Sequence, residues 1–250
     1  MPGKTLRLYP PPSKELTSSS EIYSDLELPS SGRGGKGSPY VFINMVSSVD
    51  GNAAIEGRAS GIGTAADRLV MRTLRSKADA VMIGAGTLRA EKLSLGLDSG
   101  DARPCPLAVI LTTTGDVPVE SNLVRYRDQR LLVLLADSAR EAAGARLARH
   151  AEVVRIRTTS SGHVDLASAI EQLKTDHAVD RLLVEGGPTL THAMISEGLA
   201  DEIFITLAPT LLGTSAAPTV LGGDLDAPQD LHLLSAHLAD DELFLRYALI

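Results

Sequence analysis

The sequence contains no tryptophan and few other aromatic residues, and this scarcity limits what the protein binds. Only 3% of the 250 residues are Phe, Trp or Tyr, so the aromatic surfaces on which single-stranded nucleic acids stack are lacking. Basic residues are outnumbered by acidic ones, and the formal net charge of −7 disfavours nonspecific binding to nucleic acid or anionic membranes. We therefore expect neither nucleic acid nor membrane as a partner.

Cysteine, metal-binding motifs and long apolar runs are also scarce. The single cysteine, Cys105, excludes an intrachain disulfide framework and a multi-cysteine zinc site. The six histidines show neither H-x-x-x-H nor H-E-x-x-H spacing, so we expect no metal site. No apolar run approaches the ~20 residues of a membrane span, and the Tyr-Pro-Pro-Pro at 9–12 interrupts any signal-peptide core. Together these features predict a cytoplasmic protein.

The remaining sequence is rich in aliphatic residues arranged as alternating strands and helices. Hydrophobic residues make up 44% of the chain, enough for a large aliphatic core. The patterns predict strands at 40–46, 79–84, 107–112, 131–136, 151–156, 181–185, 202–208, 231–238 and 242–249. They predict helices at 64–76, 138–149, 165–177 and 188–198. This order predicts an α/β fold with a mostly parallel central sheet and helices on both faces. The last two strands flank Asp240-Asp241 and predict an antiparallel C-terminal hairpin.

Residues 1–38 differ in composition from the rest of the chain. They contain three consecutive prolines at 10–12, three consecutive serines at 18–20 and a glycine-rich stretch at 30–37. Such a segment buries little apolar surface. We therefore predict an extended or flexible N-terminal arm and linker over 1–38, followed by one domain over 39–250.

Two strands run into glycines and then into helices. In 182–190, Leu-Leu-Val-Glu-Gly-Gly-Pro-Thr-Leu, the glycines permit close approach of a ligand to the backbone, and Pro188 suits the first helical turn. The second site is Val-Met-Ile-Gly-Ala-Gly-Thr at 81–87. If their strands are neighbours, both turns face one crevice beyond the carboxyl ends of the strands, where a pyrophosphate binds. The alternative interpretation is that the glycines only relieve packing of helix on strand.

Further polar residues lie in the first predicted strand and between the first and the second. Asn44 lies within an apolar strand, where a buried amide requires a partner. Asp50 precedes Gly51 in an ordinary turn signal. Ser60 and Arg75 suit a sugar phosphate, whereas Arg68 and Arg72 are expected at the solvated surface of the helix.

Taken in order, five motifs resemble one known family. They are Ser-Val-Asp-Gly (48–51), Ala-Asp-Ala-Val-Met-Ile-Gly-Ala-Gly-Thr (78–87), Glu-Gly-Gly-Pro-Thr-Leu (185–190), Gly-Leu-Ala-Asp-Glu-Ile (198–203) and Ala-Pro-Thr-Leu-Leu-Gly (208–213). This order resembles the reductase domain of the bifunctional riboflavin-biosynthesis deaminase/reductase and its stand-alone relatives, over about residues 39–250. The resemblance implies a dihydrofolate-reductase-like fold and a homodimer, formed through the C-terminal strands. The zinc-type His and paired-Cys motif of the deaminase is missing, so we expect no deamination.

The same resemblance implies the activity and assigns the site. It implies an NADPH-dependent reduction of a ribosylaminopyrimidine 5′-phosphate, either 5-amino-6-(5-phosphoribosylamino)uracil or its 2,5-diamino pyrimidinone analogue, with hydride reaching ribose C1′. The implied cofactor-binding residues are Val46, Gly61, Gly84, Thr87, Glu91, Thr113, Gly186, Gly187, Pro188, Thr189 and Leu190. The implied substrate-binding residues are Ser60, Arg75 and Glu185, and the implied catalytic residues are Asn44, Asp50 and Glu91. Glu91 stands where the family usually has aspartate.

Two alternative functions remain compatible with these motifs. The first is an NADPH-dependent reductase of dihydrofolate or another pteridine-like substrate, which the implied fold also suggests. The second is a nucleotide-binding protein without catalytic turnover. All three interpretations share a cofactor bound at the paired glycine turns.

Overall fold

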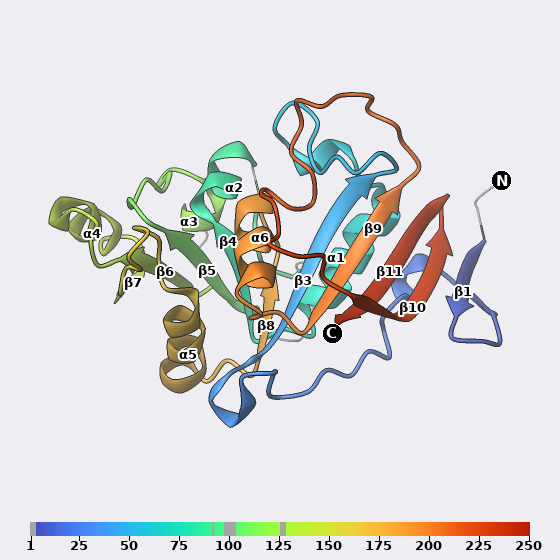
Figure 1. Ribbon diagram of the computed structural model, residues 1–250, viewed down its shortest axis with the longest axis horizontal. Helices are drawn as coiled ribbons and strands as arrows, with labels where there is room; N and C mark the ends of the chain where they lie inside the picture. Colours follow the sequence, from blue (N-terminus) through green and yellow to red (C-terminus); the bar gives the residue numbers. More distant parts are fainter. Residues whose placement is uncertain (1–3, 92, 98–103, 126–128) are drawn as a thin grey trace.

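The central feature of the computed structural model is one large sheet. The structure describes residues 4–91, 93–97, 104–125 and 129–250, without the side chain of Lys36. Eleven strands from this part of the chain form the sheet, in the order β2-β1-β10-β11-β9-β3-β8-β4-β5-β6-β7 (Figure 1). The strands are β1 (Thr5–Tyr9), β2 (Lys14–Leu16), β3 (Tyr40–Ser48), β4 (Ala80–Gly84), β5 (Leu107–Thr112), β6 (Leu131–Ala136), β7 (Glu152–Ile156), β8 (Arg181–Val184), β9 (Glu202–Ala208), β10 (Leu231–Ala239) and β11 (Glu242–Leu249).

The strands from β9 to β7 in this order are parallel to one another, whereas the two C-terminal strands pair in antiparallel register. β3 lies between β8 and β9, and β4 lies between β8 and β5. β11 pairs with β9 and with β10 in antiparallel register. Asp240 and Asp241 connect β10 to β11 with φ values of 50° and 65°, as a two-residue type I′ turn requires. The predicted mostly parallel sheet and antiparallel C-terminal hairpin are confirmed.

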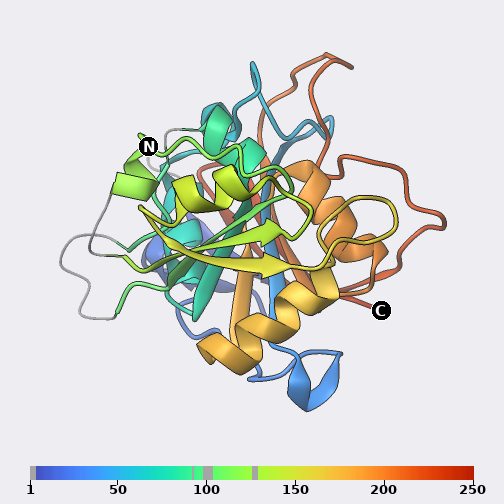
Figure 2. The ribbon, with the colours of Figure 1, turned by 90° about the vertical axis from the view of Figure 1, so that its left-hand side faces the viewer.

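Helices cover both faces of the sheet, because its strands are apolar on both sides. They are α1 (Ala65–Arg75), α2 (Ala85–Ala90), α3 (Asn122–Arg125), α4 (Glu141–Leu147), α5 (Leu166–His177) and α6 (Pro188–Ser196), with short 3₁₀ turns at Ser19–Glu21, Gly35–Gly37 and Ala59–Gly61. α4 and α5 lie on opposite sides when the sheet is viewed from its β7 end (Figure 2). The helical periods of the sequence predicted α1, α4, α5 and α6. The glycine turn at 81–87 implied a helix where α2 lies, and no pattern predicted the short α3.

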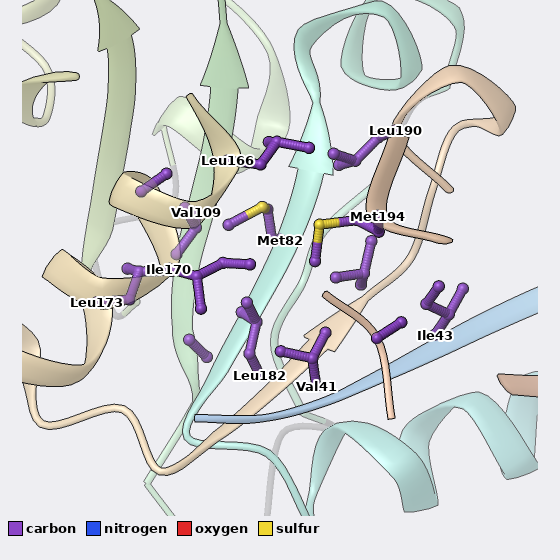
Figure 3. Close-up of a cluster of buried hydrophobic side chains, with 14 of the residues drawn as sticks. Val41, Ile43, Met82, Val109, Leu166, Ile170, Leu173, Leu182, Leu190 and Met194 are labelled. Carbon is purple, nitrogen blue, oxygen red and sulfur yellow. The ribbon is translucent and has the colours of Figure 1, made fainter. Parts of the chain in front are cut away.

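Each face of the sheet packs its own hydrophobic cluster. In β4, Met82 points to one cluster while Val81 and Ile83 point to the other, as the two-residue period of a strand requires. The first cluster packs α5 and α6 on the sheet, and Ile170 and Met194 lie within it (Figure 3). Packing on both faces explains why the central strands are continuous apolar runs.

The N-terminal segment packs against the domain, contrary to the prediction that it buries little apolar surface. β1 pairs antiparallel with β10. Ile22 and Tyr23 are buried, and the Tyr23 ring contacts the Phe204 ring edge to face with 5.0 Å between their centroids. At the glycine-rich end, the Arg33 N–H donates to the Asp201 carboxylate at 2.8 Å. The amino-acid composition of residues 1–38 did not predict these contacts, because only a few apolar residues of the segment make them.

The topology also bears on assembly and on the placement of the site. Because β1 occupies the edge of β10, a second chain has no free edge to pair with at the C-terminal hairpin. Among the described residues, no helix combines the length and apolar character that crossing a membrane requires.

The carboxyl ends of β3, β8 and β4 meet at one end of the sheet, and functional residues of α/β proteins gather at such ends.

Candidate active site

A cavity of about 740 Å³ lies beyond the carboxyl ends of β3, β4 and β8. Its volume is within the range of roughly 300–1,000 Å³ that is usual for small-molecule and cofactor sites. Most of the residues proposed from the sequence line this cavity. They are Asn44, Val46, Ser60, Arg75, Gly84, Thr87, Glu91, Glu185, Gly187, Pro188, Thr189 and Leu190. The fold thus brings together residues that are up to 146 positions apart in sequence.

The two predicted glycine turns are neighbours on the cavity wall. β4 and β8 pair in parallel, with Met82 opposite Val184. The N–H of Gly84 donates to the carbonyl of Gly186 at 3.1 Å, which joins the two turns directly. Gly187 lies close to Thr87, because a Cβ on Gly187 would stand 2.9 Å from the Thr87 hydroxyl oxygen. The shared crevice expected from the sequence is therefore present in the structure.

The surroundings of Gly84 indicate whether this glycine makes room for a ligand or for a helix packed on the strand. A Cβ added to Gly84 would meet no atom within 4 Å, although the residue lines the cavity. Its backbone is extended, with φ −76° and ψ 148°, so the conformation itself does not require glycine. Relief of helix-on-strand packing does not explain this glycine. Open space in front of the backbone is instead what a ligand in close contact requires.

Gly186 has a conformational reason to be glycine. Its φ is +76°, and an added Cβ would lie 2.9 Å from the sulfur of Met45. The Gly186–Gly187 peptide bond is cis. Gly186 itself is absent from the described cavity wall, and its cofactor contact stays a prediction.

Helix α6 begins at this turn and directs its N-terminus at the cavity. Gly187 is the N-cap, Pro188 occupies the first turn, and both line the cavity with Thr189. The first N–H groups of a nine-residue helix lack intrahelical acceptors, so they attract negatively charged groups such as a pyrophosphate. The predicted Pro188 position is confirmed.

Helix α1 forms a charged wall of the cavity. Thr64 caps the helix by accepting a hydrogen bond from the N–H of Ala66 at 3.1 Å. Val70 and Leu74 face the core, whereas the opposite stripe lines the cavity. That stripe contains Asp67, Arg68, Met71, Arg72 and Arg75. Arg68 is exposed, as predicted, and Arg72 is half-buried, but both also border the cavity. Their spacing of four and three residues from one another and from Arg75 places the three arginines on a common face.

Arg75 and Glu185 form a buried ion pair at the cavity wall. The guanidinium donates to both carboxylate oxygens, from Nε at 2.6 Å and from Nη2 at 2.7 Å. Only 6% of the Arg75 side chain and 9% of the Glu185 side chain are exposed. Burial by itself lowers the pKa of Arg75, but the Glu185 carboxylate outweighs burial and the net direction is upward. Both groups therefore present fixed charges to a ligand.

Glu91 fastens the loop opposite the glycine turns. Its Oε1 accepts hydrogen bonds from the backbone N–H groups of Ala59 and Ser60, the latter at 3.4 Å. Glu91 and Ser60 both line the cavity.

Asn44 lies in β3 and presents a polar group with no partner in the fold. It lines the cavity and is partly buried. Within the part of the chain that the structure describes, its amide makes no hydrogen bond. A polar group of this kind is available to a ligand, and the sequence prediction for Asn44 agrees with this placement.

Asp50, Gly61 and Thr113 are absent from the described cavity wall. Asp50 accepts hydrogen bonds from Ser48 at 2.6 Å, from Leu212 N–H at 3.1 Å and from Gly213 N–H at 2.7 Å. These bonds, that of Ser48 first, hold its pKa below the ordinary value. Asp50 therefore fixes a loop outside the described cavity wall, and its catalytic role stays a prediction. The cofactor contacts of Gly61 and Thr113 stay predictions that rest on the family resemblance.

Asp67 is the cavity residue that sequence reasoning missed. The net pKa of Asp67 is raised to about 6. Burial is the largest cause, and the carboxylates of Glu242 and Glu185 act in the same direction, whereas the hydrogen bond to Thr206 and the charge of Arg68 lower the pKa. Because Glu242 and Thr206 come from β11 and β9, no local pattern around Asp67 signals this environment. Among the described residues, no group of three or more His, Cys, Asp or Glu side chains is arranged to hold a metal ion.

Comparison with known proteins identifies relatives over most of the chain. The family model described as "RibD C-terminal domain" matches residues 39–242. The 2,5-diamino-6-ribosylamino-4(3H)-pyrimidinone 5′-phosphate reductase of Archaeoglobus fulgidus is 33% identical over 196 residues, which are 74% of this chain and 87% of the relative. The enzyme of the same name from Methanothermobacter thermautotrophicus is 30% identical over 216 residues, 84% of this chain and 97% of the relative.

A solved structure shows the same arrangement. RibD of Acinetobacter baumannii superposes with a TM-score of 0.71 at 25% identity. The match covers 86% of this chain but only 59% of the RibD chain, so this chain spans little more than half of that protein.

Proposed function

Because the chain belongs to the RibD C-terminal domain family and shares its dihydrofolate-reductase-like fold, we propose that it is a reductase of riboflavin biosynthesis. The proposed reaction is the NADPH-dependent reduction of a ribosylaminopyrimidine 5′-phosphate, with hydride transfer to ribose C1′. The two relatives at 30% identity or more are named for the 2,5-diamino pyrimidinone substrate, so this compound is the first candidate and the uracil analogue the second.

The observation that carries the proposal is the pair of joined glycine turns on one cavity. Gly84 borders open space, and the N-terminus of α6 borders the same cavity. A dinucleotide needs both features, because its pyrophosphate requires N–H donors and its length requires close approach to the backbone. The reductase family to which the chain belongs uses a nicotinamide cofactor, and the resemblance implies that this cofactor is NADPH.

The residues around these turns would hold the cofactor. They are Val46, Gly84, Thr87, Gly187, Pro188, Thr189 and Leu190, with Glu91 fixing the adjacent loop. When bound, NADPH supplies the hydride that the substrate carbon receives. The aliphatic side chains of Val46 and Leu190 exclude water from their side of the cavity. Thr87 and Thr189 offer hydroxyl donors.

The opposite wall would hold the sugar phosphate. Arg68 and Arg72 lie on the same face of α1 as Arg75, and this concentration of guanidinium groups suits a phosphate. The Arg75–Glu185 pair offers fixed charges for the ribose hydroxyls. Asn44 supplies an amide with no other partner among the described residues. This wall positions the reacting carbon, and correct positioning contributes a large part of the rate of such reactions.

A direct assay tests the proposal. The purified chain is mixed with NADPH and each of the two ribosylaminopyrimidine phosphates, and oxidation is followed by the loss of reduced-nicotinamide absorbance. We expect turnover with at least one of them, and faster turnover with NADPH than with NADH. Turnover only with dihydrofolate would overturn the proposed substrate, and cofactor binding without turnover on any of these compounds would indicate a non-catalytic protein.

We also propose that the protein is a homodimer, as the family resemblance implies. The β10 edge is already paired with β1, so the dimer must form through a different surface than that strand edge. Light scattering on the purified chain, with an expected mass of twice 26.3 kDa, tests this assembly. A mass of one chain at micromolar concentration would contradict it.

A further inference from the structure

The proposed reaction requires a proton as well as a hydride, and this inference rests on the proposed function. Opening the ribose ring places an electron pair on the ring oxygen O4′, which must be protonated. The described residues that line the cavity include no histidine, lysine, tyrosine or cysteine. Arginine does not release its proton at physiological pH. The protein groups left as proton donors are therefore three carboxyl groups, those of Asp67, Glu91 and Glu185.

Two of these carboxyl groups are held as hydrogen-bond acceptors. Both oxygens of Glu185 accept from the Arg75 guanidinium, at 2.6 and 2.7 Å. Oε1 of Glu91 accepts from two backbone N–H groups of the neighbouring loop. These oxygens are therefore engaged by hydrogen-bond donors of the protein itself. We assign both groups to holding their neighbours in place.

Asp67 has the opposite environment. It lies in the first turn of α1 with its carboxyl group against Gly63, where a Cβ would overlap it, so glycine makes room for this group beside the cavity. Burial above all, together with the facing carboxylates of Glu242 on β11 and Glu185 after β8, raises its pKa to a net value of about 6, although a hydrogen bond to Thr206 on β9 and the charge of Arg68 on α1 lower the pKa. With this pKa about half of the protein carries a protonated Asp67 at pH 6 and about a tenth at pH 7.

We propose that Asp67 is the general acid of the reduction and donates its proton to O4′ of the ribose as the C1′–O4′ bond breaks. The electron pair of that bond goes to O4′, which takes the proton from Asp67, while the lone pair of the glycosidic nitrogen forms a C=N bond to C1′. C1′ then accepts the hydride that the cofactor supplies, the C=N electron pair returns to nitrogen, and the nicotinamide is left oxidised. Water returns a proton to Asp67.

The test compares Asp67→Asn and Asp67→Glu with the wild type and with Asp176→Asn, a matched change on an exposed residue of α5. The kcat and KM for the pyrimidine substrate are measured from about pH 5 to 9. The NADPH-induced rise in melting temperature reports whether each variant is folded and binds cofactor. We expect Asp67→Asn to lower kcat by about 100-fold, the lower limit of general acid catalysis, with little change in KM or in the NADPH effect. Asp67→Glu keeps the proton donor and restores part of kcat.

The pH profile separates proton donation from a structural role. In the wild type kcat falls tenfold per pH unit above the pKa of Asp67, whereas in Asp67→Asn this fall disappears. An Asp67→Asn variant with wild-type kcat, or with a reduced kcat but an unchanged pH profile, overturns the role of Asp67 as general acid. It leaves the proposed function of the protein standing. A wild type that reduces neither pyrimidine substrate overturns the proposed function and, with it, this inference.

Discussion

Asp67 should reduce the stability of the folded protein at neutral pH, and this cost is measurable without any substrate. Its pKa is about 6 in the folded chain, compared with an ordinary value of 3.8. Below about pH 4 both the folded and the unfolded chain keep the proton, so folding is not penalised. Between about pH 4 and 6 the unfolded chain loses the proton while the folded chain retains it, so the free energy of unfolding falls as pH rises. Above about pH 6 the penalty is constant.

The magnitude follows from the two pKa values. A difference of one pKa unit corresponds to about 1.36 kcal/mol, so a rise from 3.8 to about 6 corresponds to a penalty of about 3 kcal/mol. Asp67→Asn removes the titrating proton while keeping a similar shape. We therefore expect this variant to unfold with a free energy about 3 kcal/mol higher than the wild type above about pH 7. The difference in the free energy of unfolding between this variant and the wild type should shrink toward zero near pH 4.

Urea denaturation of the two proteins at a series of pH values measures this difference directly. Subtracting the wild-type free energy from that of the variant cancels the titration of all other groups that behave alike in both. Asp176→Asn, exposed on α5, should differ from the wild type by less than about 0.5 kcal/mol at every pH. A difference between Asp67→Asn and wild type that is the same at pH 4 and pH 8 would refute the argument, because it would show that the Asp67 proton is not bound more tightly in the folded state.

Three further predictions follow from the site and the N-terminal segment. Gly84→Val should fold, because its Cβ meets no atom within 4 Å, but should weaken NADPH binding at least tenfold by calorimetry; Gly37→Val, the same change at an exposed glycine with equally open surroundings, should bind normally. Glu185→Gln leaves Arg75 buried without a carboxylate and should lower the free energy of unfolding by about 3–5 kcal/mol in urea. Ile22→Ala should cost about 2–5 kcal/mol in the same assay because the side chain is fully buried, whereas a loss near zero would show that the segment is not packed.

Local sequence patterns were sufficient for the elements that form the sheet. The strands from β3 to β11 are encoded by short aliphatic runs, and β9 and β11 have the predicted bounds. The turn at Asp240-Asp241 and the N-cap at Thr64 depend on residues within a few positions of one another. Sequence alone predicts such features well because their energies come from near neighbours.

The sequence also located most of the candidate site, because glycine turns are local signals and strand order brings them together. It did not determine which glycine faces open space. Gly84 and Gly186 occupy similar motifs, yet the first borders the cavity and the second is required by its positive φ and by Met45. Only the packing of β3 against the turn separates these two roles.

What the sequence by itself determined was therefore the set of elements and the pair of turns, because each depends on contacts within a short stretch of chain. The alternation of strands with helices indicated in addition that the central sheet is mostly parallel. Tertiary structure alone decided the packing of residues 5–26, the Arg75–Glu185 pair and the environment of Asp67. Arg75 and Glu185 are 110 residues apart, and the Glu242 carboxylate that acts on Asp67 is farther still along the chain. Electrostatic interactions and burial depend on distance in space, and only the folded chain sets that distance.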